Sequence, residues 1–162
     1  MSMEVNGMPT FDYLSGKPKK MTINLNLNDS IKKALSEFEG DQRNFSLLAS
    51  MIVSRLCVAG ENFAKEAVPV DTGELHDSIS HSVRGSKRGV VHGVIKAGTD
   101  HAAFVEFGTG IEGRKKGYPD PNVFWIYDIY EQNWKGQPSN PFMYDTARYI
   151  ENNAYDIIKG YK

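Results

Sequence analysis

Four histidines and one cysteine are the side chains of this chain that are best suited to chemistry. Histidine binds metals or transfers protons near neutral pH, and cysteine acts as a nucleophile when it is a thiolate. His76, His81, His92 and His101 show no zinc-site spacing, and a polar pair of His81 and His92 across a hairpin is favoured. Cys57 stands in an apolar run, which predicts a buried structural thiol. We therefore predict no metal site and no catalytic residue, with a metal-dependent hydrolase, whose histidines meet a carboxylate, as an alternative.

Residues 108–113, with the sequence Gly-Thr-Gly-Ile-Glu-Gly, match the G-x-G-x-x-G pattern of dinucleotide-binding sites. Such a site needs a helix that begins at the third glycine and holds the pyrophosphate, and residues 114–119 are not expected to form one. The stretch 110–122 is predicted to be a charged loop instead. Because the sequence also lacks the common nucleophile and phosphate-binding motifs, no enzymatic function and no cofactor are expected.

Three basic residues of this loop, Arg114, Lys115 and Lys116, could contact phosphate groups. A formal net charge of -1 gives the chain no general attraction to nucleic acid, so these side chains are expected to face solvent or a protein partner. A small DNA-binding adaptor that uses Lys115 and Lys116 stays open as an alternative function.

Length and composition indicate one globular domain preceded by an arm. The chain has 162 residues, of which 40% are hydrophobic and 24% charged. Residues 1–28 mix glycine, proline and lysine and are predicted to form the arm; within it, residues 22–28 alternate like a strand that pairs only in an assembly, or belong to a partly ordered tail. The domain covers 29–162. The uncharged run between Arg43 and Arg55 is shorter than the roughly 20 residues that span a bilayer, so no membrane association is expected.

Residues 29–38 are predicted to form a short helix and residues 44–67 a long amphipathic helix, because apolar side chains recur every three or four positions in the second stretch. The apolar stripe of the long helix comprises Leu48, Ile52, Leu56, Ala59, Phe63 and Ala67. Pro69 ends this helix, and Asp71 with Glu74 predicts a capping box for a short helical turn that follows.

The pattern then changes to the period of two that is typical of strands. Residues 79–84 and 91–97 predict a β-hairpin, and residues 124–127 and 130–134 predict two further strands. The result is a small antiparallel sheet of about four strands, interrupted by the charged loop. Alternation in the second hairpin points half of its aromatic residues outward, where they suit a protein interface. These aromatic residues are Trp125, Tyr127, Tyr130 and Trp134.

A single helical turn over residues 101–107 is expected to follow the first hairpin. Asp100 is predicted to cap this turn, and Phe104 and Phe107 are predicted to anchor it over the sheet. Gly108 then ends the turn, because glycine adopts backbone angles that other residues avoid.

A closing C-terminal helix completes the predicted fold. Asn140 is expected to cap it, Pro141 occupies a position that helices tolerate, and Phe142 docks the helix on the domain. Its apolar stripe comprises Met143, Ala147, Ile150, Ala154 and Ile157. A long helix, a small antiparallel sheet and a closing helix give the fold class α+β.

Three separate signatures occur in this order along the chain. The first reads Ala-Val-Pro-Val-Asp-Thr-Gly-Glu-Leu over residues 67–75, the second Ala-Phe-Val-Glu-Phe-Gly-Thr-Gly over residues 103–110, and the third Gly-Gln-Pro-Ser-Asn-Pro-Phe-Met over residues 136–143. With the long helix and the hairpin, they make residues 46–159 resemble the head-tail joining and tail-completion family of long-tailed siphophages, which is related to the tail-completion protein Z of phage lambda.

The resemblance implies a structural virion protein without catalytic activity. Such a protein sits in the phage neck or at the top of the tail, completes the tail and enables head-tail joining by assembling as a ring, expected to be a hexamer. The implied partners are copies of the same chain, the tail terminator, the head-closure protein and the tail tube; packaged DNA passes nearby without sequence-specific binding. The implied location is the virion, and the host cytoplasm during assembly. A tail terminator or a head-closure ring protein is the nearest alternative.

On this interpretation the signature residues have mechanical tasks. The expected structural junctions are Pro69, Asp71, Thr72, Gly73, Leu75, Phe104, Phe107, Gly108, Pro141 and Phe142. The candidate interface comprises Glu106, Arg114, Lys115, Lys116, Trp125, Tyr127, Tyr130 and Trp134. For Glu106 three interpretations stay open: an ion pair with a neighbouring subunit, an acceptor of backbone hydrogen bonds, or an ordinary exposed side chain.

Overall fold

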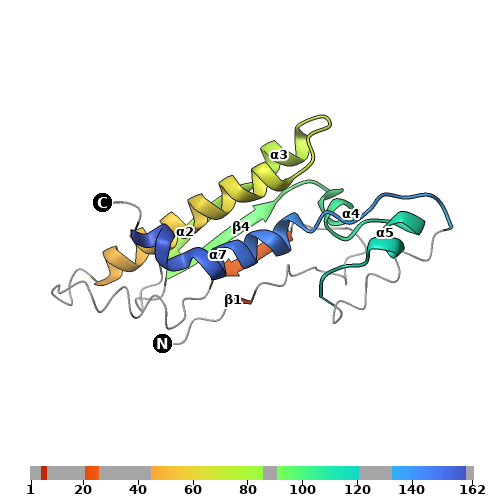
Figure 1. Cartoon of the computed structure of the whole chain (residues 1–162). Coiled ribbons are helices and arrows are strands. Elements are labelled where there is room, and N and C mark those ends of the chain that lie inside the picture. Colours follow the sequence, from red (N-terminus) through yellow and green to blue (C-terminus); the bar gives the residue numbers. More distant parts are fainter. Residues whose placement is uncertain (1–4, 7–20, 26–44, 86–90, 121–132, 160–162) are drawn as a thin grey trace.

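The computed structural model describes residues 5–6, 21–25, 45–85, 91–120 and 133–159 of the chain (Figure 1). The helices are α2 (Phe45–Ala67), α3 (Glu74–Ser78), α4 (Ala102–Phe107), α5 (Gly110–Lys116) and α7 (Phe142–Lys159). The strands are β1 (Val5–Asn6), β2 (Met21–Leu25), β3 (Ser80–Gly85) and β4 (Val91–Ala97). The fold is therefore α+β, as the sequence predicts.

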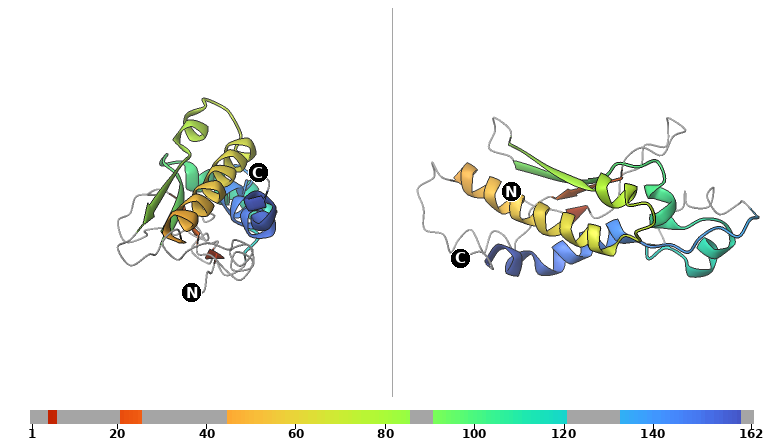
Figure 2. Two further views of the ribbon diagram at one scale, coloured as in Figure 1. Left: turned by 90° about the vertical axis from the view of Figure 1, so that its left-hand side faces the viewer. Right: turned by 90° about the horizontal axis from the view of Figure 1, so that it is seen from above.

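The two long helices lie side by side on one face of the sheet and run in opposite directions (Figures 1 and 2). α2 packs on β3 and β4, while α7 packs beside α2 and over β2. Stacked rings of Phe63 and Tyr149, with centroids 4.4 Å apart, join the two helices. The guanidinium of Arg55 donates a hydrogen bond of 3.1 Å to the carbonyl oxygen of Ile158, which satisfies one of the free carbonyl groups at the end of α7.

The buried face of α2 is wider than the predicted stripe. Of that stripe, Ile52 and Leu56 are fully enclosed, whereas Leu48, Ala59, Phe63 and Ala67 are only partly covered. The remaining buried positions of the helix are Ala49, Val53, Cys57, Gly60 and Ala64. Contacts on two sides, with α7 and with the sheet, explain the difference, because a stripe along one face cannot serve both neighbours.

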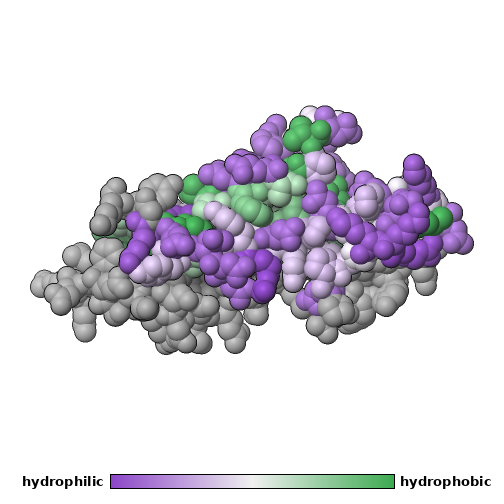
Figure 3. Space-filling view, in the orientation of Figure 1, coloured by the Kyte–Doolittle hydropathy of each residue, from purple (hydrophilic) through white to green (hydrophobic). Residues whose placement is uncertain are grey.

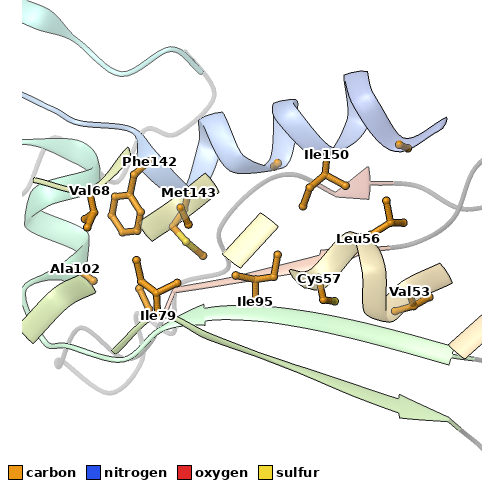
Figure 4. Packing of buried hydrophobic residues seen from close by; sticks show 14 of the residues in the cluster. Val53, Leu56, Cys57, Val68, Ile79, Ile95, Ala102, Phe142, Met143 and Ile150 are labelled. Carbon is orange, nitrogen blue, oxygen red and sulfur yellow. The ribbon is translucent and has the colours of Figure 1, made fainter. Parts of the chain in front are cut away.

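The core forms where these elements meet. Figure 4 shows Met143 of α7, Ile95 of β4, and Leu56 and Cys57 of α2 in one cluster of buried side chains. Burial, with a further contribution from the nearby charge of Glu61, raises the pKa of the Cys57 thiol to about 12. The thiol is therefore protonated at neutral pH, in agreement with the predicted structural role.

The sheet confirms the first predicted hairpin and corrects the second. β3 and β4 pair antiparallel, with Ser82 opposite Val94. The predicted strand 124–127 lies outside the described residues, and so does most of 130–134, whose last residue, Trp134, is in a bend and not in a strand. Two of the predicted strands are thus found, not four.

The other neighbours in the sheet come from the N-terminal part of the chain. β2 pairs antiparallel with β4, and β1 pairs with β2, which gives the strand order β1-β2-β4-β3. Part of the alternating stretch 22–28 therefore belongs to a strand that pairs within the chain, where a strand that pairs only in an assembly, or a partly ordered tail, was expected. The predicted helix over residues 29–38 lies outside the described residues.

By length and composition alone, Leu47–Ala67 could cross a membrane. The prediction from the sequence used only the uncharged run between Arg43 and Arg55, and it therefore did not identify this longer helix as a candidate membrane span. The signal is weak, because the core helix of a soluble protein passes the same test, and α2 packs against α7 and the sheet in this structure.

Candidate functional site: the junction around Glu106

Glu106 is a charged residue of α4 that is buried in the fold and is 0% exposed. Its carboxylate oxygen Oε2 accepts a hydrogen bond of 2.8 Å from the backbone N–H of Met143, and Oε1 accepts one of 3.0 Å from the N–H of Tyr144. Oε1 also accepts a hydrogen bond of 2.9 Å from the hydroxyl of Tyr118. Because α7 begins at Phe142, Glu106 serves as the N-terminal cap of α7 from a distant part of the chain.

This geometry decides between the three interpretations of Glu106. The side chain accepts backbone hydrogen bonds, and the expected place on the protein surface is wrong. Burial and the neighbouring Asp145 raise the pKa of Glu106 to about 7, while the hydrogen bonds from Met143, Tyr144 and Tyr118 oppose the rise. Burial and Glu106 also raise the pKa of the Tyr118 phenol, so this hydroxyl stays a donor.

Asn140 connects three elements at the same junction. Its backbone N–H donates a hydrogen bond of 2.8 Å to the carbonyl of Val105, and its side-chain amide donates one of 3.2 Å to the carbonyl of Ala67, the last residue of α2. Asn140 thus supplies a donor to a free carbonyl group at the end of α2. The prediction that its side chain caps α7 is wrong, because Glu106 accepts the hydrogen bonds from the first N–H groups of α7.

The two predicted anchors of α7 have distinct positions. The carbonyl oxygen of Pro141 accepts a hydrogen bond of 2.8 Å from the N–H of Asp145. Phe142 is fully buried in the core, as Figure 4 shows. The predicted stripe of α7 is buried at Met143, Ala147, Ile150 and Ala154, with Ile158 more fully buried than the predicted Ile157.

The second and third sequence signatures are joined by an antiparallel β-bridge between Thr109 and Gln137, termed the crossing. The N–H of Thr109 donates to the carbonyl of Gln137 at 2.9 Å, and the N–H of Gln137 donates to the carbonyl of Thr109 at 3.2 Å. Gly108 has φ 72° and ψ 175°, and a side chain there would approach the backbone nitrogen of Ser139 to 2.5 Å. A side chain at Gly136 would overlap the carbonyl of Thr109. Both glycines are required because the two backbones touch.

The stretch predicted to be a loop after Gly108 contains the helix α5. Backbone hydrogen bonds of 3.0 Å, from Ile111 to the carbonyl of Trp134 and from Glu112 to that of Lys135, hold its first residues. The helix begins at the second glycine of the G-x-G-x-x-G string and follows α4 instead of a strand, so it lacks the arrangement of a dinucleotide site.

Two of the three basic residues of α5 have partners within the chain. Lys115 donates to the carboxylate of Glu112 at 2.7 Å, and Lys116 donates to the carbonyl of Ser139 at 2.7 Å. Arg114 is exposed. These contacts leave Arg114 as the least constrained member of the predicted basic cluster.

The first signature forms an exposed turn between α2 and α3. Gly73 precedes α3 with φ 83°, as its sequence position predicts, and Leu75 is buried. Asp71 makes no capping hydrogen bond; the N–H of Glu74 instead has a long contact of 3.4 Å with the Thr72 hydroxyl. The predicted capping box is therefore wrong: glycine in the left-handed conformation occupies the N-cap position.

The end of this turn is fixed to the sheet. Ser78 donates a hydrogen bond of 2.7 Å from its hydroxyl to the carbonyl of Leu75 and accepts one of 3.1 Å from the N–H of Gly98. Pro69 lies exposed at the opposite end, two residues after the last residue of α2. The turn is thus a rigid connection with an accessible surface.

The helical turn α4 only partly matches its prediction. Phe107 is fully buried, whereas Phe104 is 41% exposed and does not anchor the turn over the sheet. The N-cap position belongs to His101, without a side-chain cap, so the predicted role of Asp100 is also wrong. The buried residues of α4 are Ala102, Ala103, Glu106 and Phe107.

The histidines lie apart from one another. His81 is opposite Ile95 and His92 is opposite Arg84, so the predicted pair of His81 and His92 does not form. His81 instead contacts the carboxylate of Glu61 at 2.5 Å, and the other oxygen of that carboxylate accepts from Lys65 at 2.6 Å. Burial opposes ionisation of Glu61, but both hydrogen bonds outweigh it and lower its pKa.

Within residues 45–85, 91–120 and 133–159, three or more histidine, cysteine, aspartate or glutamate side chains nowhere come together as a metal site would require. Of the meetings of histidine and carboxylate that the hydrolase alternative requires, His81 with Glu61 and His76 with Asp77 are present, each without a third such side chain beside it in the described segments. Of the candidate aromatic interface, Trp125, Tyr127 and Tyr130 lie outside the described residues, and Trp134 is 52% exposed.

Sequence reasoning missed two features of the site because both depend on residues distant in the chain. The cap of α7 joins positions 37 and 38 residues apart, and the crossing of Thr109 and Gln137 joins positions 28 apart. The sequence did contain an indication of the second feature: the second and third signatures occur one after the other, and in the fold their backbones pair with each other.

A family model of known proteins matches part of the chain. Residues 51–108 match the family model described as "Bacteriophage HK97-gp10, putative tail-component". The matched segment runs from the middle of α2 through the exposed turn and the hairpin to the end of α4. No curated protein and no solved structure matches the chain. The match covers 58 of the 162 residues, and this part of the chain is similar to a phage tail component. A place among the head-tail joining proteins and a specific relation to the lambda protein Z stay predictions.

Proposed function

We propose that the chain is a structural component of the phage neck or tail top, which completes the tail and enables head-tail joining by assembling as a ring. The observation that carries the proposal is the family match over residues 51–108. It includes Glu106, whose carboxylate forms a hydrogen-bonded junction with the start of α7. A tail component interacts with other virion proteins and is located in the virion.

The chemical groups of the described segments support a structural role. Cys57 is buried with a raised pKa, Glu106 caps α7, and Glu61 joins α2 to β3 through His81. Each of these groups stabilises a contact between two elements of the fold. The tail-component family is structural, which agrees with this use of the polar residues.

The proposed ring is a hexamer built from copies of the chain. Its proposed neighbours are the tail terminator, the head-closure protein and the tail tube, and assembly takes place in the host cytoplasm. The exposed Trp134 keeps its proposed role in this assembly, whereas Glu106, Phe104 and Asp71 do not keep the roles first expected of them. The other expected junctions keep theirs: Pro69, Thr72, Gly73, Leu75, Phe107, Gly108, Pro141 and Phe142. Ring formation would use two different surfaces of each copy, because a closed ring of more than two copies needs head-to-tail contacts.

The experiment is a complementation of phage assembly. A phage with a stop codon in the gene for this chain is expected to produce DNA-filled heads and separate tails, counted by negative-stain electron microscopy. Purified chain added to the lysate should restore joined particles and plaque formation. The matched control is chain carrying Gly136→Val, which cannot form the crossing with Thr109. Joined, infectious particles in the complete absence of the chain would overturn the proposal.

A further inference from the structure

Acidic residues gather on the turn between α2 and α3. Residues 66–77, termed the acidic turn, contain no lysine or arginine, and Val70 at the centre is 70% exposed. The acidic residues, all exposed, are Glu66, Asp71, Glu74 and Asp77. The carboxylate of Asp77 contacts the neighbouring His76 at 2.9 Å. Within the described residues, the ion pairs that involve lysine or arginine are formed by carboxylates outside this turn. The acidic turn therefore presents an apolar centre with negative charge around it.

Basic residues gather at the end of the molecule formed by α5 and the segment beside it. Residues 111–116 with 134–135, termed the basic end, contain four basic residues and one acidic residue, Glu112. Ile111 and Trp134 are 40% and 52% exposed, and backbone hydrogen bonds hold the two segments together. Arg114 and Lys135 are exposed beside them. The basic end is thus an ordered surface with an apolar centre and positive charge around it.

The two surfaces lie at different places on one molecule. Both α3 and α5 are visible in Figure 1, and the view from above in Figure 2 also separates them. Figure 3 shows hydrophobic spots within hydrophilic surface over the α2–α3 turn and over the α5 end. Because both segments are fixed by hydrogen bonds to the body of the fold, one chain does not bring them together.

We propose that the acidic turn of one copy docks on the basic end of the next copy. This inference rests on the ring assembly proposed above and names the surfaces that would form it. Exposed apolar side chains within a rim of charge are the usual anatomy of a protein interface, and opposite charges direct two surfaces to the correct partner. A nucleic acid on the basic end would leave the acidic turn and Val70 without a role. A second copy of the chain uses both surfaces at once.

The contact is heterologous, since two different surfaces meet. An open head-to-tail assembly keeps one free acidic turn at one end and one free basic end at the other, so association continues until a ring closes. Its rate and specificity should depend on salt, because the Debye length falls from about 8 Å at physiological ionic strength to about 3 Å at 1 M. Self-association should therefore weaken as salt is added.

A charge exchange tests the contact. The turn-reversed chain carries Asp71→Lys with Glu74→Lys, and the end-reversed chain carries Arg114→Glu with Lys135→Glu. The turn-reversed chain loses the net negative charge of its acidic turn, and the end-reversed chain changes the net charge of its basic end from positive to negative. Each variant alone therefore loses the attraction between the two surfaces and should associate at least tenfold more weakly than the wild type. An equimolar mixture should regain assembly. The unchanged basic end of one variant meets the unchanged acidic turn of the other, and at the second contact the introduced lysines face the introduced glutamates.

Assembly is measured by mass photometry and by cross-linking of light and isotope-labelled chains with a carbodiimide, which joins lysine to carboxylate. The wild type should give inter-chain links between the basic end and the acidic turn. The matched control carries Glu151→Lys with Asp156→Lys, two exposed acidic positions of α7, and should assemble like the wild type. Thermal unfolding followed by circular dichroism confirms that every variant is folded.

The inference is overturned if wild-type chains give no such inter-chain links at their highest soluble concentration, or if the mixture of reversed variants fails to assemble. Its failure is distinct from failure of the proposed function. A chain that assembles through these surfaces, but whose loss leaves phage particles joined, contradicts the tail role only. Joined particles formed with either reversed variant alone contradict the surfaces only.

Discussion

The junction around Glu106 and the acidic turn look alike in the sequence, since each combines an acidic residue with glycine and threonine, but they differ in what surrounds them. The carboxylate of Glu106 is enclosed and accepts three hydrogen bonds. The carboxylates of Asp71 and Glu74 are exposed and cap nothing. Similar residue types thus stabilise the fold in one region and remain accessible to a partner in the other. Substitutions that separate stability from assembly test this difference.

The largest expected difference concerns the glycines of the two regions. Gly108 combines φ 72° and ψ 175° with a backbone atom 2.5 Å from the position of a side chain, whereas the nearest atom to such a side chain at Gly73 is 4.0 Å away. Gly108→Ala should cost more than about 4 kcal/mol of unfolding free energy or prevent folding, and Gly73→Ala about 1–2 kcal/mol. Urea denaturation measures both. Equal losses in the two variants would show that the crossing does not require glycine.

Removal of the Glu106 carboxylate is expected to be the next largest effect. Glu106→Ala leaves the N–H groups of Met143 and Tyr144 at the start of α7 without an acceptor, which should cost about 3 kcal/mol. Glu106→Gln keeps one acceptor oxygen and should cost about 1–2 kcal/mol. The matched control is Glu112→Gln on α5, which should leave stability almost unchanged. A Glu106→Ala variant as stable as this control would contradict the capping role.

The junction should also respond to pH. Burial, followed by the charge of Asp145, raises the pKa of Glu106 from 4.5 to about 7 in the folded chain, against the hydrogen bonds that lower it. The folded state therefore binds more protons than the unfolded state between these values, and stability falls as pH rises through about 7. Relative to Glu106→Gln, the wild type should lose on the order of 2–3 kcal/mol between pH 4.5 and 8. Denaturation series at several pH values measure this difference, which parallel curves would rule out.

The elements with a recognisable pattern inside one segment could be predicted from the sequence. The elements and caps that depend on contacts with distant residues could not. Spacing of apolar residues found α2, α7 and the hairpin β3–β4, because these patterns lie within one segment. It missed α5, whose first residues are held by carbonyl groups of residues 134–135. Local spacing also assigned the caps of α3 and α7 to nearby Asp71 and Asn140. In the structure Gly73 stands at the N-cap position of α3, and Glu106 accepts hydrogen bonds from the first N–H groups of α7. Local chemistry identifies a candidate cap, but only the fold shows which candidate reaches the helix.

The smallest expected effect distinguishes the corrected turn from the predicted one. If Asp71 capped α3, Asp71→Ala would cost about 1 kcal/mol, the usual loss for an N-cap residue. Because its side chain is exposed and makes no capping hydrogen bond, the substitution should change stability by less than about 0.5 kcal/mol. Urea denaturation resolves these outcomes, with Leu75→Ala as a buried control that should cost about 2–5 kcal/mol. If the Asp71→Ala chain is as stable as the wild type but associates less well, Asp71 contributes to the contact between copies and not to the stability of the fold.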